Sequence, residues 1–236
     1  MGKKQDKKQF PLTNKENCAI YLTRIISSCE LCMDRYKKYN RETQAILDKY
    51  QNGDVIAYDI YGDICDKTCN IMSYLLNLLG DCQTTSISYF KYRKQVQKLI
   101  NKGIVGIQLS SLDSETEDVL AEFNKLRNWQ NHVPESLLIS ELELIEKKKM
   151  NLPSNPMNIV HYNYVTYEYF MDLYASNLDF CKNARKIIQV AKRDYALLMG
   201  ESISYPRVYS DKPITLEKSE PTKMSAQIQG LKGNNH

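Results

Sequence analysis

The chain has 236 residues, of which 42% are hydrophobic and 25% charged, as in an ordinary globular protein. Lys and Arg number 32 against 28 Asp and Glu, so the net charge of +4 is mildly basic and compatible with RNA. No apolar run is long enough to cross a bilayer, which excludes a membrane-spanning protein. The polar, lysine-rich start argues against a secretory signal, so we expect a cytoplasmic protein.

Seven cysteines, an odd number, argue against a disulfide framework. Two pairs have spacings that can suit a metal, Cys29 with Cys32 and Cys65 with Cys69. Both pairs fall on the apolar stripe of a predicted helix and lack a neighbouring histidine, so we interpret them as small hydrophobic residues. The remaining alternative is that the two pairs meet in space. We expect neither a metal nor a cofactor.

The first half of the chain predicts long helices, since only nine Gly and seven Pro interrupt the 236 residues. Residues 1–13 are expected to form a disordered basic tail. The first helix is predicted over 14–51, where apolar side chains recur in steps of three and four. A second is predicted over 54–79 and a third over 84–102, each followed by a glycine stop. Residues 104–112 have no helical period and are interpreted as a packed loop.

The second half continues the pattern. Ser111 or Asp113 can cap a fourth helix, which Pro134 should end, and a fifth follows over about 135–150. After a break rich in Asn and Pro, a long last helix is predicted over 157–199.

Residues 201–236 are polar and are expected to be a mostly disordered tail. The predicted fold is therefore a single domain over 14–200. It is an all-α antiparallel bundle of five or six helices with long first and last members.

The fourth predicted helix ends in Arg127-Asn128-Trp129-Gln130-Asn131-His132, called the hexapeptide below. An arginine supplies a permanent cation for phosphate oxygens, and a histidine moves protons near neutral pH. Arg127 and His132 lie about 140° apart on an ideal helix, so they share a face only if the helix ends near Trp129. Asn128 and His132 are spaced to hydrogen-bond, which would fix the imidazole tautomer.

A structural interpretation of the same residues stays open. His132 can satisfy carbonyl groups at the end of a helix, and Arg127 can form a surface ion pair with Glu122 or Asp118. Trp129, the only tryptophan, is interpreted as a core anchor, with a lid over the site as the alternative.

Leu126-Arg127-Asn128 through His132 resembles the R-N-x-x-x-H signature of the HEPN superfamily, helical bundles common in toxin–antitoxin, abortive-infection and CRISPR effector proteins. The literal match is confined to the hexapeptide. The resemblance implies a metal-independent endoribonuclease whose cleft forms at a homodimer interface, acting in antiviral defence or as a toxin. It implies that Arg127 holds the scissile phosphate, that His132 is the general acid or base, and that Asn128 orients the pair.

RNA contacts are expected from Lys125 and Asn131, beside or within the hexapeptide, and from Lys91 and Arg93. The last two belong to Tyr89-Phe90-Lys91-Tyr92-Arg93, which interleaves aromatic and cationic side chains. Its tyrosines can equally pack inward. The alternative function is a non-catalytic helical interaction or regulatory protein, such as an antitoxin or a phage-protein binder. A third is a coiled-coil-like adaptor, which the Cys and Tyr content of the first stripe disfavours.

Overall fold

The computed structural model describes residues 10–83, 86–104, 106–131, 135–149, 151, 161–202, 204, 206–209 and 211–212. The chain divides into two units, residues 1–203 and 204–236. The described residues of the second unit form no helix or strand.

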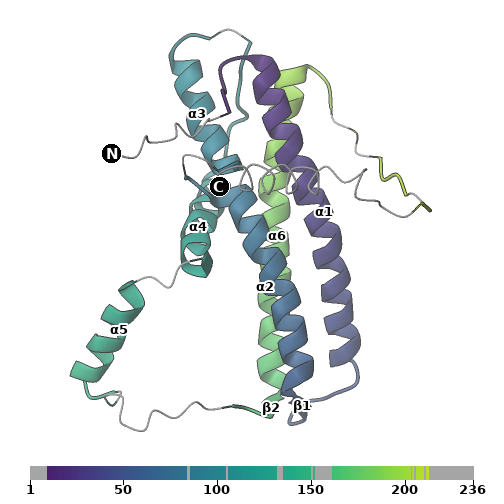
Figure 1. Ribbon diagram of the computed structural model, residues 1–236, viewed down its shortest axis with the longest axis vertical. Coiled ribbons are helices and arrows are strands. Elements are labelled where there is room, and N and C mark those ends of the chain that lie inside the picture. Colours follow the sequence, from purple (N-terminus) through teal and green to yellow (C-terminus); the bar gives the residue numbers. More distant parts are fainter. Residues whose placement is uncertain are drawn as a thin grey trace, which may run out of the picture. The chain divides into compact units, whose positions relative to one another are not determined.

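The first unit is an all-α bundle, as the sequence predicts (Figure 1). Its described elements, in chain order, are α1 (Lys15–Leu47), β1 (Val55–Ala57), α2 (Tyr58–Gly80), α3 (Tyr89–Asn101), α4 (Ser114–Asn131), α5 (Glu135–Glu146), β2 (Tyr164–Thr166) and α6 (Tyr167–Met199). The first and last helices are the longest, at 33 residues each. No described helix is long and apolar enough to cross a membrane.

Several helices begin or end at residues whose side chains or backbone satisfy the free polar groups there. The Asn14 side chain accepts a hydrogen bond from the Asn17 amide, Ser88 does the same for α3, and Thr166 for α6. Asp113, one of the two predicted caps, accepts from the Thr116 amide at 2.7 Å. At the other end of α6, Gly200 has φ +81°, a left-handed conformation that glycine adopts without strain.

The core is formed by α1, α2 and α6, which run side by side (Figure 1). Leu47 at the end of α1 packs with Ile64 near the start of α2 and Phe170 near the start of α6. The first helix is therefore antiparallel to the other two. Helix α4 packs on α2 and α6, while α3 packs on α1 and α2.

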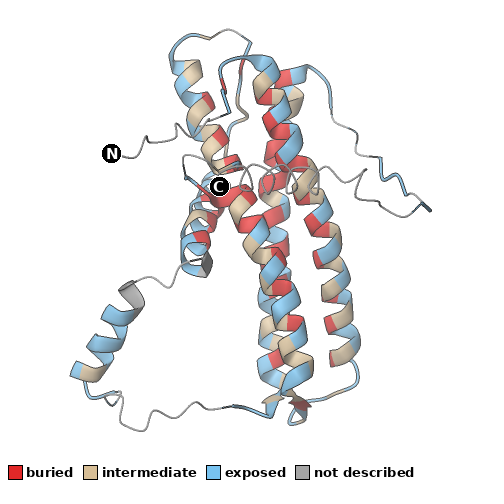
Figure 2. Cartoon of the chain, viewed as in Figure 1, coloured by how far each residue is buried: buried red, intermediate tan, exposed pale blue. Residues whose placement is uncertain are grey.

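The apolar stripe predicted for the first helix is buried, and Figure 2 shows burial concentrated where the long helices face one another. Cys18, Cys29 and Cys32 lie in this core, and all seven cysteines are free thiols. The sulfur atoms of Cys65 and Cys69 lie 3.8 Å apart. Among the described residues, no three His, Cys, Asp or Glu side chains gather where they could hold a metal ion, so the two cysteine pairs form no joint site.

The two strands replace helix that the sequence predicted. β1 and β2 pair antiparallel, with Ile56 opposite Val165, so the second helix begins at Tyr58 rather than at 54. The last helix begins at Tyr167, and His161, predicted to lie within it, precedes β2. Each three-residue strand depends on a partner more than a hundred positions away, which local periodicity cannot reveal.

A close contact between α2 and α4 positions the hexapeptide. A Cβ atom added to Gly80 would lie 2.6 Å from the backbone carbonyl carbon and oxygen of Phe123. The Asn124 side chain donates a hydrogen bond of 2.6 Å to the Gly80 carbonyl. Only glycine permits this approach, which brings the end of α2 against the last turns of α4.

Candidate functional site

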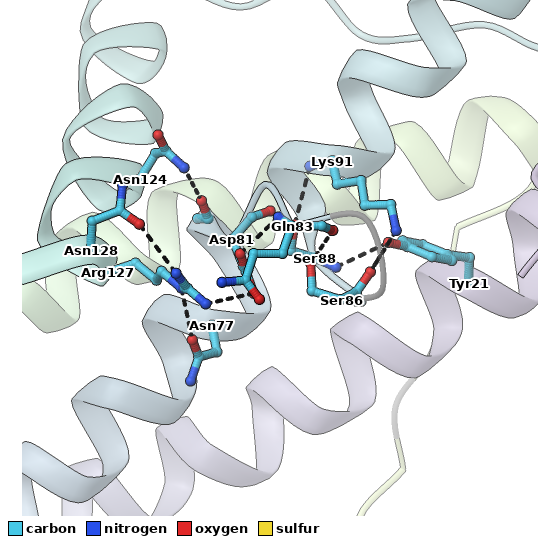
Figure 3. Close-up of polar contacts among 11 residues, drawn as sticks. Tyr21, Asn77, Asp81, Gln83, Ser86, Ser88, Lys91, Asn124, Arg127 and Asn128 are labelled. Carbon is cyan, nitrogen blue, oxygen red and sulfur yellow. Dashed lines mark hydrogen bonds and ion pairs between the residues drawn. The ribbon is translucent and has the colours of Figure 1, made fainter. Parts of the chain in front are cut away.

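Arg127 extends from α4 toward the end of α2, and its side chain is held on three sides (Figure 3). Nη2 donates to Asp81 Oδ2, Nε donates to Asn77 Oδ1, and Nη1 donates to Asn128 Oδ1, each at 3.2 Å. The residue is only 8% exposed. The guanidinium plane is therefore fixed by Asn77 on α2, by Asp81 directly after α2, and by Asn128 on α4 itself.

Asp81, the partner of Arg127, is itself held in place. It is 4% exposed, and its second carboxylate oxygen accepts from the Gln83 amide at 2.9 Å. Its backbone carbonyl accepts from the Ser88 hydroxyl. Breaking a buried ion pair by removing one partner typically costs about 3–5 kcal/mol, because it leaves an uncompensated charge. Arg127 and Asp81 therefore clamp α4 to the end of α2.

Lys91 lies on the other side of this network (Figure 3). Its ammonium group donates to the Ser86 carbonyl at 2.9 Å, and its backbone amide donates to the Ser88 hydroxyl. Burial lowers the pKa of Lys91, and the nearby Asp81 carboxylate partly offsets this. Tyr21 completes the network by accepting from the Ser88 amide at 3.0 Å. Lys91 thus ties the loop that follows α2 to the start of α3.

Arg93 belongs to a second buried cluster, around Asp194 of α6. Arg93 Nη1 and the Tyr89 hydroxyl both donate to Asp194 Oδ2, at 3.1 and 2.6 Å. The Ser110 amide and hydroxyl donate to the other carboxylate oxygen. Burial, followed by the Asp194 charge, raises the pKa of Tyr89 well above its usual value. Tyr89 and Tyr92 are buried, so the aromatic–cationic segment packs inward.

The opposite face of α4 carries Lys125 and Trp129. Both are exposed and line a hollow with Asp118, Glu122 and Leu126. The prediction that Trp129 anchors the core is wrong, since the residue is 52% exposed. The buried stripe of α4 runs through Phe123 to Arg127, and two further positions turn Trp129 by about 200° away from it. The stripe ends on the buried arginine instead of the tryptophan.

The remaining site residues predicted from the sequence fall at the limit of the described chain. Asn131 ends α4, but its side chain lies outside the described residues, as does the whole of His132. The structure therefore brings together Arg127 and Asn128, with Lys91 across the Asp81 network. It places Arg93 in the separate Asp194 cluster and Lys125 on the opposite face of α4.

Asp81 and Asn77 are the site residues that the sequence interpretation missed. The position of Asp81 could have indicated a nearby cation. An acidic side chain at the negative end of a helix is unfavourable unless a cation compensates it. Asp81 follows the last residue of α2 in this position. Nothing in the sequence pairs it with an arginine 46 positions later, however.

Comparison with protein-family models, with curated proteins and with solved structures finds no match to this chain. The chemistry must be inferred from the site alone. A guanidinium has five N–H groups, and the three bonds to described residues use one on each nitrogen. An arginine held rigidly in this way is suited to stabilising an oxyanion with any N–H group that stays unpaired.

Proposed function

We propose that the chain is a metal-independent endoribonuclease of the HEPN type, with the C-terminal turn of α4 as its catalytic segment. One observation carries the proposal. The arginine of the R-N-x-x-x-H hexapeptide is fixed in orientation by three acceptors, including the asparagine that follows it in the motif. Preorganised donors of this kind stabilise developing negative charge without having to reorganise during the reaction.

The proposed reaction is an internal attack within RNA. His132 removes the proton of a ribose 2′-hydroxyl, and the 2′-oxygen attacks the adjacent phosphorus. Arg127 stabilises the pentacoordinate oxyanion through the N–H groups left over by its fixed partners. The bond from phosphorus to the 5′-oxygen then breaks, and that oxygen takes up the proton that His132 holds. The products are a 2′,3′-cyclic phosphate and a 5′-hydroxyl end. Asp81 and Asn128 act as positioning residues.

A homodimer is part of the proposal, because one arginine and one histidine per chain make a sparse catalytic set. Helix α5 offers a surface for it. Leu138, Ile139 and Leu142 are each 57% exposed, and Leu144 is 41% exposed, although all four are apolar residues of a short helix. Exposed apolar patches of this kind often mark interaction sites. A second copy of the chain covering α5 would bury them.

The biological setting is proposed from the HEPN resemblance alone. It is antiviral defence or a toxin activity in the cytoplasm, with RNA as substrate and an antitoxin or a phage protein as a further partner. Asn131 would contact RNA beside the scissile phosphate, and Lys125, on the face of α4 opposite Arg127, would attract a more distant part of the strand. Lys91 and Arg93 would support the fold around Asp81 and Asp194, since their bonds are internal.

A second candidate function is a non-catalytic helical interaction protein. The observation that favours it is the Asp81–Arg127 ion pair, which neutralises the arginine in a nearly buried position. Under this alternative the hexapeptide only joins α2 to α4. The exposed leucines of α5 would then bind a different protein.

Cleavage of total cellular RNA in EDTA separates the two functions. We expect the wild type to cut, His132→Ala to be inactive, and Arg127→Lys to lose at least about a hundredfold in rate, because lysine keeps the charge but not the planar fork. His161→Ala is the matched control, since His161 is exposed and lies outside the hexapeptide. Full activity of folded His132→Ala would refute the ribonuclease proposal.

A further inference from the structure

A groove of about 710 Å³ lies between α1 and α6, and its lining is basic. Four cations border it, Lys37 and Arg41 from α1 with Lys182 and Arg185 from α6. The lining contains no carboxylate. In a chain with 32 basic and 28 acidic residues, this local imbalance is large. It attracts anions whatever their identity.

Several cations near the groove are paired with carboxylates. Lys38 and Lys67 both contact Glu42, Lys186 contacts Glu115 at 2.5 Å, and Lys192 contacts Glu30 at 2.6 Å. Within the described residues, Arg41, Lys182 and Arg185 form no such ion pair, while Lys37 contacts Asp34 at 3.8 Å, the same distance as Lys38 from Glu42.

The floor of the groove holds a buried amide. Asn40 is mostly buried, and its side-chain oxygen has no hydrogen-bond partner within the described residues. Its amide nitrogen contacts the sulfur of Cys181, which also lines the groove. Burial raises the pKa of Cys181 to about 11, while Arg185 and Lys37 act in the opposite direction, so both cations lie near this floor.

The walls add an apolar part. Tyr174 is half-buried and Leu178 is exposed, and both lie on α6 one turn or more before the cations of that helix. Volumes of roughly 300–1,000 Å³ are typical of small-molecule sites. From the four cations, the absence of a carboxylate in the lining and the aromatic wall, we propose that this groove binds a small phosphorylated ligand of nucleotide size. Its phosphates contact the four cations, and its apolar or aromatic part lies against Tyr174.

Calorimetric titration of the full chain with tripolyphosphate and, separately, with ATP tests this proposal. We expect both to bind, with ATP tighter. Arg41→Gln and Arg185→Gln should each weaken both ligands about tenfold, the scale of one charge-assisted hydrogen bond. Tyr174→Leu should weaken ATP alone. Arg24→Gln, an exposed arginine of α1 outside the groove, is the matched control and should have no effect.

Three results would overturn the proposal. The first is absence of binding by a folded protein. The second is an equal loss in Arg24→Gln, which would indicate general charge attraction. The third is binding of single-stranded DNA with no binding of either small anion, which would make the groove part of a nucleic-acid surface. None of these outcomes bears on the hexapeptide, because the assay requires no RNA cleavage.

Discussion

The buried ion pair of Arg127 and Asp81 stabilises the fold, and it also positions the arginine for the proposed cleavage. We expect Arg127→Met to lower the free energy of unfolding by about 3–5 kcal/mol, because Asp81 is left buried and unpaired. The double variant with Asp81→Asn should lose less than the sum of the two single variants. Chemical denaturation measures these values.

The exposed pair of Glu143 and Lys147 is the matched control, and its removal should change stability by no more than about 0.5 kcal/mol. Additive losses in the Arg127 and Asp81 variants would contradict the pairing.

For single residues, the sequence predicted which positions cap or end a helix, but it did not predict the long-range partner of Arg127. The cap at Asp113 and the stop at Gly200 follow from local rules and are confirmed. The partner of Arg127 was expected among Glu122 and Asp118 on its own helix, whereas it is Asp81. Helical spacing reveals neighbours within one helix only, and this bond joins two helices.

At the level of elements, Gly80 sets the distance between α2 and α4. Gly80→Ala should destabilise the protein by about 1–3 kcal/mol, because the added carbon meets the backbone of Phe123 and neither helix can yield locally. It should also reduce RNA cleavage if the proposed function holds, since Arg127 and Asp81 would separate.

Gly62→Ala is the matched control for this change. It lies within the same helix, where an added carbon would be 3.8 Å from the Tyr58 ring. It should leave stability unchanged or raise it, because alanine is the better helix former. Thermal denaturation of both variants tests this prediction. Equal melting temperatures would contradict a close contact between Gly80 and the backbone of Phe123.

Helix α5 is the element whose exposed apolar side chains the fold does not explain. If a second copy covers them, Leu142→Glu should shift a dimer toward monomer in analytical ultracentrifugation, because a charge would be buried at the interface. Leu31→Glu on α1 is the control, since Leu31 is 68% exposed on another helix. Unchanged association of Leu142→Glu would exclude α5 from a dimer interface.

For the whole molecule, the buried core predicts loss of stability at alkaline pH. Burial raises the pKa of Cys181 from 9.0 to about 11, so the folded state keeps the proton longer than the unfolded chain does. Stability from this group is fully present below pH 9 and falls as pH rises toward 11, by about 2–3 kcal/mol.

Denaturation at several pH values checks this, with Cys181→Ala expected to show a shallower decline than the wild type. Cys82→Ala, which removes an exposed thiol, should decline as the wild type does. Equal slopes for Cys181→Ala and the wild type would contradict the assignment.

The overall architecture could be predicted because it depends on periodicity. The stripe through Leu22, Ile25 and Cys29 specifies a buried helix face wherever its neighbours lie. The pairing of β1 with β2 and the clamp between α2 and α4 depend on contacts far apart in sequence. The site is therefore less predictable than the fold, since its geometry comes from such contacts.

The central claim is an attack by the ribose 2′-hydroxyl without a metal, and the chemistry of the cut ends tests it most directly. Purified protein should be incubated in EDTA with an RNA oligonucleotide and with the same oligonucleotide methylated at every 2′-oxygen. We expect 2′,3′-cyclic phosphate and 5′-hydroxyl ends on the first oligonucleotide and no cutting of the second. Cleavage of the methylated strand, or 5′-phosphate ends, would contradict it.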